Sequence, residues 1–146
     1  MIWIIDGVMA GLIAGVIMGC VSQLSYWFGI LKSHLIVIDG EFVLRKLKQN
    51  TPAPAVYATG IMIHLVTSIV FGIIYVLIAK LVGLELRTIW AITVYVTILW
   101  LAMLFTALPI AGQGFLGKKI RHYAWLEQLI LHIVFGVSFW WALGIS

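Results

Sequence analysis

Charged residues are scarce in this chain: they make up 10% of its 146 residues, whereas hydrophobic residues make up 64%. Soluble globular domains carry about 25% charged residues, and a small domain leaves much of its surface in water. A soluble fold would therefore expose more apolar surface than water tolerates, so the composition indicates a chain that resides in lipid. The length fits one compact domain, which we expect to cover residues 1–146.

Cysteine and catalytic motifs are also scarce. The single cysteine, Cys20, excludes an intrachain disulfide and a cysteine-based zinc site. No nucleophile elbow, His-Glu-x-x-His helix or phosphate-binding loop is present, and the G-x-G-x-x-G match at residues 112–117 follows an apolar span rather than a strand. The net charge of +4 comes without a basic patch interleaved with aromatic residues, which disfavours nucleic-acid binding. These absences favour a non-enzymatic protein.

Four apolar stretches are long enough to cross a bilayer, because a spanning helix needs about 20 mostly apolar residues. They cover approximately residues 7–30, 55–79, 88–108 and 123–145. We expect Asp6 to cap the first helix, where an anion is favourable, and Pro109 to end the third. The sequence thus predicts an all-α membrane protein, a bundle of four transmembrane helices.

Basic residues are distributed unevenly among the three loops. The first and third loops hold seven (Lys32, Arg45, Lys46, Lys48, Lys118, Lys119 and Arg121), and the second holds two (Lys80 and Arg87). The positive-inside rule therefore places loops one and three in the cytoplasm and both termini outside. We expect a multi-pass protein of a bacterial or archaeal inner (plasma) membrane, in contact with the lipid bilayer.

Two of the loops have distinctive compositions. In the first, Phe42, Val43, Leu44 and Leu47 alternate with charged residues, which predicts a short amphipathic surface helix or, alternatively, a partner-docking element. The third loop, from Pro109 to Gly117, holds three glycines in six residues, which are poor helix formers. It predicts a tight turn at the interface or, alternatively, a short re-entrant segment lining a cavity.

Glycines recur at helical spacing in the first span, at Gly7, Gly11, Gly15 and Gly19. Residues four apart lie on one face of a helix, and small residues there let another helix approach closely. The partner is another span of the bundle or a second copy of the chain. Similar stripes hold Gly60 and Gly72 in the second span and Gly136 in the fourth.

Two histidines, His64 and His132, lie at about the same depth in the second and fourth spans, which run in the same direction. Ionisable groups within a span are costly, so both are candidate functional residues. They fit the two axial ligands of a b-type haem, hydrogen bonds across the bundle, or a proton-relay or quinone site together with Glu127 and Gln128. Glu127 is alternatively the ion-pair partner of a loop cation.

Three features of the chain together suggest a family: the glycines of the first span, the Leu108–Gly117 turn and the Leu131-His-Ile-Val-Phe-Gly136 motif. The chain resembles a family of small bacterial four-span inner-membrane proteins of unknown function. The resemblance implies a four-helix bundle and no particular activity, and it places His132 and the glycine-rich turn in the family pattern.

The predicted role follows from strong helix-packing patterns and absent catalytic motifs. We expect a non-catalytic subunit or accessory protein that packs against a membrane protein partner or against itself. The alternatives are a redox subunit that binds haem b or a quinone through His64 and His132, and a small transporter or channel.

Overall fold

The computed structural model describes residues 2–46 and 52–145, and in these ranges every regular element is a helix. The long helices are α1 (Ile2–Trp27), α3 (Ala53–Leu81), α4 (Ile89–Ala102) and α6 (Ala124–Ala142). The third of them continues through a π-helical turn, η1 (Met103–Ala107), into α5 (Leu108–Ile110). All four are long and apolar enough to cross a membrane, so the chain is an integral membrane protein with an all-α, four-helix fold, as predicted.

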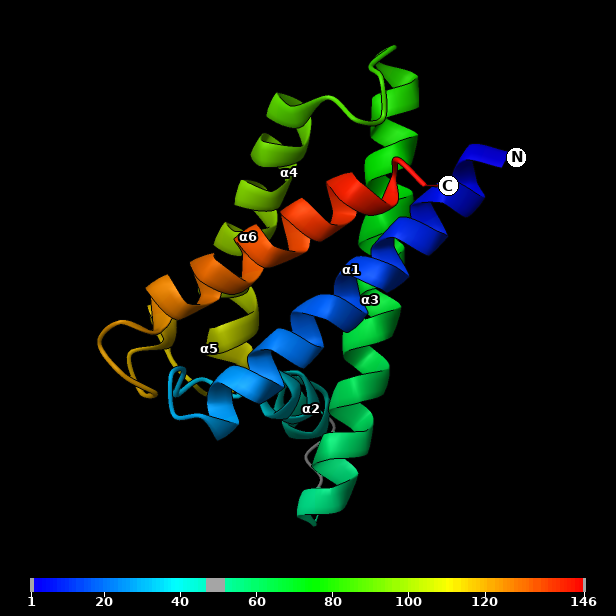
Figure 1. Cartoon of the computed structure of the whole chain (residues 1–146). Helices are drawn as coiled ribbons and strands as arrows, with labels where there is room; N and C mark the ends of the chain where they lie inside the picture. Colours follow the sequence, from blue (N-terminus) through cyan, green and yellow to red (C-terminus); the bar gives the residue numbers. More distant parts are fainter. Residues whose placement is uncertain (1, 47–51, 146) are drawn as a thin grey trace.

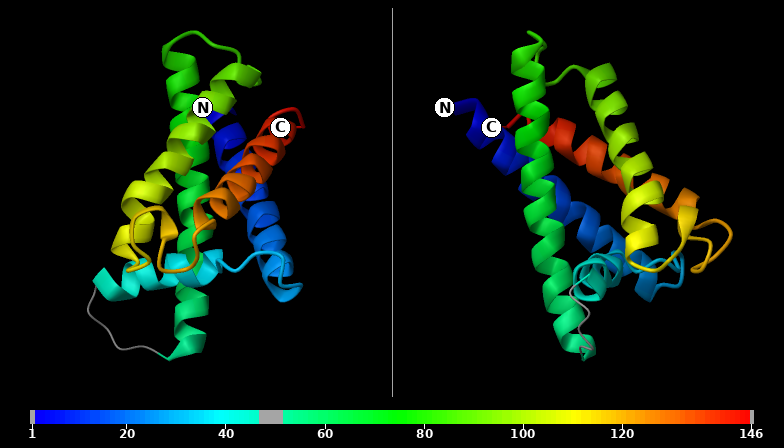
Figure 2. Two further views of the ribbon diagram at one scale, coloured as in Figure 1. Left: turned by 90° about the vertical axis from the view of Figure 1, so that its left-hand side faces the viewer. Right: turned by 180° about the vertical axis from the view of Figure 1, so that it is seen from behind.

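The four long helices alternate in direction (Figure 1). α1 and α4 run toward the end of the bundle that carries the short helix α2 (Leu35–Lys46), and α3 and α6 run away from it. Figure 2 shows both chain ends at the opposite end from α2, and the third loop on the same side as α2. The first and third loops therefore share one end of the bundle.

Two helix ends differ from the prediction. α1 already begins at Ile2, so Asp6 lies inside the helix and does not cap it. The apolar residues before Asp6 extend the helix, and one acidic side chain at its surface does not stop it. The third span continues past Pro109 to Ile110, because the π-helical turn that ends two residues before the proline accommodates its ring and its missing N–H.

The short helix predicted in the first loop is present as α2. Its Leu35, Ile36, Ile38 and Leu44 are buried, because α2 packs closely against the side of α3. The predicted apolar residues Phe42 and Val43 are half-buried, whereas Leu47 and Lys48 lie outside the described residues. α2 is thus an integral part of the bundle end.

The third loop folds as a compact turn. Gly112, Gly114 and Gly117 adopt φ angles of 80°, 74° and 69°, a region in which other residues are strained. The carbonyl of Gln113 accepts a hydrogen bond from the Lys119 N–H at 3.1 Å, which closes the turn. The Gln113 amide donates to Glu41 Oε2 at 2.8 Å and so joins the third loop to α2.

A candidate binding cavity beside α3

The glycine face of α1 packs directly on α3. A Cβ atom at Gly11 would collide with the carbonyl oxygen of Ser68, and one at Gly7 would lie 2.8 Å from the carbonyl oxygen of Gly72. A Cβ at Gly15 would lie 2.5 Å from the Ser68 hydroxyl. The two backbones therefore touch along this seam, which only glycine permits on the α1 side.

The remaining predicted packing glycines also face helices of the same chain. A Cβ at Gly19 would lie 3.5 Å from the His64 ring, and one at Gly136 would lie 3.2 Å from a Val96 methyl group on α4. A Cβ at Gly60 would collide with the carbonyl oxygen of Ile36 in α2.

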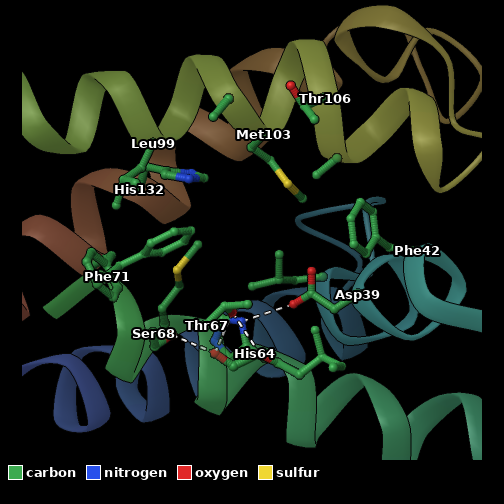
Figure 3. A pocket seen from close by; sticks show the side chains of 16 residues that line it. Asp39, Phe42, His64, Thr67, Ser68, Phe71, Leu99, Met103, Thr106 and His132 are labelled. Carbon is green, nitrogen blue, oxygen red and sulfur yellow. Dashed lines mark hydrogen bonds and ion pairs between the residues drawn. The ribbon is translucent and has the colours of Figure 1, made fainter. Parts of the chain in front are cut away.

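On its opposite side, α3 diverges from α4. The two helices are joined where the Tyr95 hydroxyl donates to the Phe71 carbonyl at 2.7 Å and the Tyr75 and Tyr95 rings lie 5.3 Å apart. Toward the α2 end they separate, and a half-open cavity of about 290 Å³ occupies the space between them (Figure 3). The cavity is lined by Met18, Leu35, Asp39, Phe42, Ile63, His64, Thr67, Ser68, Phe71, Leu99, Ala102, Met103, Thr106, Ala107, His132 and Phe135.

His64 lies where the α1–α3 seam meets this cavity. Its Nε2 is 3.0 Å from the carbonyl oxygen of Gly15, and its Nδ1 is 3.1 Å from Oδ2 of Asp39 on α2. Because a carbonyl oxygen only accepts, Nε2 must carry a proton and donate. The imidazole on α3 therefore contacts α1 through Nε2 and α2 through Nδ1. The expected hydrogen bond across the bundle is present.

The contact between His64 and Asp39 must contain one further proton. If the carboxyl is ionised, Nδ1 donates and the ring is an imidazolium; if Nδ1 is bare, the carboxyl is protonated and donates. Both arrangements have zero net charge, which suits a site of low polarity. Burial raises the pKa of the Asp39 carboxyl, and the hydrogen bond and charge of His64 oppose that rise.

The sequence does not single out Asp39 as a site residue. The signal was nevertheless present, because Leu35, Asp39 and Phe42 have the spacing of one helical face and all three line the cavity. In Figure 3 the Asp39 carboxylate points into the cavity beside His64. Its Oδ1 makes no hydrogen bond to the described residues and remains free for a ligand.

His132 lies across the cavity from His64, as Figure 3 shows. The predicted juxtaposition of the two histidines is therefore present in the fold. The His132 Nδ1 is 2.8 Å from the carbonyl oxygen of Gln128, one turn earlier in α6, so Nδ1 must be the protonated nitrogen. In the neutral ring, Nε2 is then an acceptor, and it has no hydrogen-bond partner among the described residues.

The hydroxyl groups on the α3 wall add further acceptors. The Thr67 hydroxyl hydrogen is directed to the carbonyl oxygens of Ile63 and His64, at 2.8 and 3.0 Å. Ser68 Oγ likewise donates to the His64 carbonyl at 2.7 Å. Their hydrogens are used within α3, so these groups offer lone pairs to the cavity.

Glu127 and Gln128 do not line this cavity. Glu127 is buried, and its Oε2 accepts from the Ser33 N–H at 2.8 Å, the Ser33 hydroxyl at 2.6 Å and the Lys32 N–H at 3.1 Å. Its Oε1 lies 3.2 Å from the Arg121 guanidinium, so the expected ion pair with a loop cation is present. Glu127 thus ties the first and third loops to α6. The Gln128 amide is fully buried and has no partner among the described residues.

A haem held by both histidines stays a prediction. Nε2 of His132 is free, but both nitrogens of His64 make hydrogen bonds. Coordination of iron by His64 would require the loss of its contact with Gly15 or with Asp39.

Searches against protein-family models, curated proteins and solved structures gave no significant match to this chain. The chemistry of the cavity is therefore the basis for a functional assignment.

Proposed function

We propose that this chain is a non-catalytic membrane protein that takes an amphiphilic small molecule from the bilayer into the cavity between α3 and α4. The single observation that carries this proposal is the combination of apolar walls with polar groups that present lone pairs. Such a site suits an apolar body with one hydrogen-bond-donating head, because buried polar groups require partners.

The position of the cavity supports entry from the lipid. It is half-open, and Ala102 and Thr106, which line it on the α4 side, are exposed at the surface of the bundle. Asp39 and His64 lie at the end of the cavity nearest α2, so a ligand would direct its head toward the loop side. Under the positive-inside rule, we propose that this is the cytoplasmic side.

An accessory role within a membrane assembly is part of this proposal. The glycine faces of α1 already contact α3, so a partner protein or a second copy would use another, lipid-facing surface. Purification in mild detergent tests this role. Recovery of only a stable monomer without a co-purifying partner would count against it.

The binding function is tested with 1-naphthalenemethanol, a small apolar alcohol, and the protein in lipid nanodiscs. Ala102→Trp places a large ring at the mouth of the cavity, and we expect it to weaken binding about tenfold or more, because the site is sterically filled. Leu101→Trp is the matched control: Leu101 is exposed but does not line the cavity. Equal affinities of both variants and the unchanged protein would disprove binding in this cavity.

A further inference from the structure

The net charge of the cavity depends on whether the Asp39–His64 pair holds its shared proton. With its shared proton the pair is neutral, and without that proton it carries one negative charge on the carboxylate. An unpaired charge is costly in a low-polarity site, so loss of the proton must be compensated by another cation.

We propose that the cavity exchanges this proton for a lipophilic ammonium ion, so that each bound ammonium ligand releases one proton from the Asp39–His64 pair. The inference rests on the proposed function, since it concerns the same cavity, and it specifies the head group of the ligand and its coupling to protons.

The lining of the cavity favours an ammonium over a neutral head. His132 Nε2 and the hydroxyls of Thr67 and Ser68, whose hydrogens are directed elsewhere, all present lone pairs, and Asp39 adds a carboxylate oxygen. Three phenylalanine rings also line the space, and aromatic faces attract cations. The lining phenylalanines are Phe42, Phe71 and Phe135.

The exchange balances in charge and in protons. Before binding, the pair holds one proton between Nδ1 and Oδ2 and keeps a second proton on Nε2, which donates to Gly15. On binding, the shared proton leaves to solvent, and the ammonium N–H groups become the donors to the Asp39 carboxylate and to the bare Nδ1. The site is neutral in both states, because one positive charge replaces another.

Among the side chains that the structure describes, few other ionisable groups face the pair. Across the cavity, α6 contributes His132. Directly before α2, His34 contacts the Tyr57 hydroxyl at 3.0 Å. On α2, Glu41 accepts a hydrogen bond from Gln113. The only acidic or basic residue of α1 is Asp6, toward the other end of the helix, and α4 and η1 contain none. The pair is therefore the principal proton store of the cavity.

The test compares 1-naphthylmethylamine, which is protonated near neutral pH, with 1-naphthalenemethanol, its neutral counterpart. Calorimetric titrations of the protein in nanodiscs, in buffers of different ionisation enthalpy, measure the protons released. We expect about one proton per bound amine and about none for the alcohol. Over the range in which the amine stays protonated, its affinity should rise about tenfold per pH unit, because protons compete for the pair.

Asp39→Asn provides the second arm, with Asp6→Asn as the matched control on α1. The first variant should abolish proton release and weaken amine binding about tenfold or more, with a smaller loss of alcohol binding, since the amide cannot replace the carboxylate charge but still accepts a hydrogen bond. Alcohol binding together with amine binding that releases no proton would overturn this inference and leave the proposed function standing. Failure of both ligands to bind would overturn both.

Discussion

The two sides of α3 make opposite kinds of contact. Toward α1, glycine and serine let the backbones touch, and the seam continues from Gly72 to His64. Toward α4, Phe71, Tyr75 and Thr67 meet a helix that diverges, and a cavity remains. Because close packing resists movement, the seam anchors α3 and allows the opposite side to stay open to a ligand.

Loss of the His64 ring would disturb both sides and should have the largest effect. His64→Leu removes the partner of Asp39 and of the Gly15 carbonyl together, and leaves a half-buried carboxyl without a partner. We expect the free energy of unfolding to fall by about 3 kcal/mol, since loss of one member of a buried pair is costly. Denaturant titration in mixed micelles measures this loss.

Amide hydrogen exchange shows which part of the molecule is destabilised by His64→Leu. The amides of α2 should lose protection in His64→Leu, because Asp39 anchors α2 to α3 through this ring. His122→Leu, in the exposed third loop, is the control and should leave α2 unchanged. Unchanged protection of α2 in His64→Leu would show that the ring does not hold this helix in place.

Much of this contrast could be predicted from the sequence. Hydropathy locates the spans, glycine spacing identifies the face of α1 that packs closely, and the depths of His64 and His132 place them together. These features depend on the local spacing of residues and on the order of the spans along the chain, and both can be read from the sequence.

The cavity and its carboxylate could not be predicted in the same way. Asp39 has no distinctive sequence motif around it, and its role depends on α2 folding back against α3. The divergence of α3 and α4 depends on tertiary packing, and the passage of the helix through Pro109 depends on a local π turn. Such features arise from contacts between elements, and no single stretch of the chain encodes them.

The next test concerns the seam alone, through Gly72→Ala. The added methyl group would collide with the carbonyl oxygen of Gly7, and backbone cannot retreat as a side chain can. We expect a loss of about 2 kcal/mol in the free energy of unfolding, typical of overpacking. At Gly136 the added methyl group would meet only the Val96 side chain, with the nearest methyl at 3.2 Å, so Gly136→Ala should change stability by no more than about 0.5 kcal/mol. Equal losses in the two variants would remove the distinction between the seam and the other helix contacts.

Apart from the control variants, the smallest loss of stability is expected on the open side, from Tyr95→Phe. This change removes the hydroxyl that donates to the Phe71 carbonyl at 2.7 Å and keeps the ring. The cost should be about 1 kcal/mol, that of one ordinary hydrogen bond.

The more informative result of Tyr95→Phe is the distance between α3 and α4. Spin labels at the exposed positions Val70 and Ile98, in a Cys20→Ser background, report the width of the gap. We expect a broader distance distribution that extends to longer separations, whereas Tyr123→Phe, at an exposed ring, should leave it unchanged. If the distribution stays narrow, the tyrosine contact does not set the gap, and the seam with α1 together with the short turn before α4 must hold α3 and α4 at their separation.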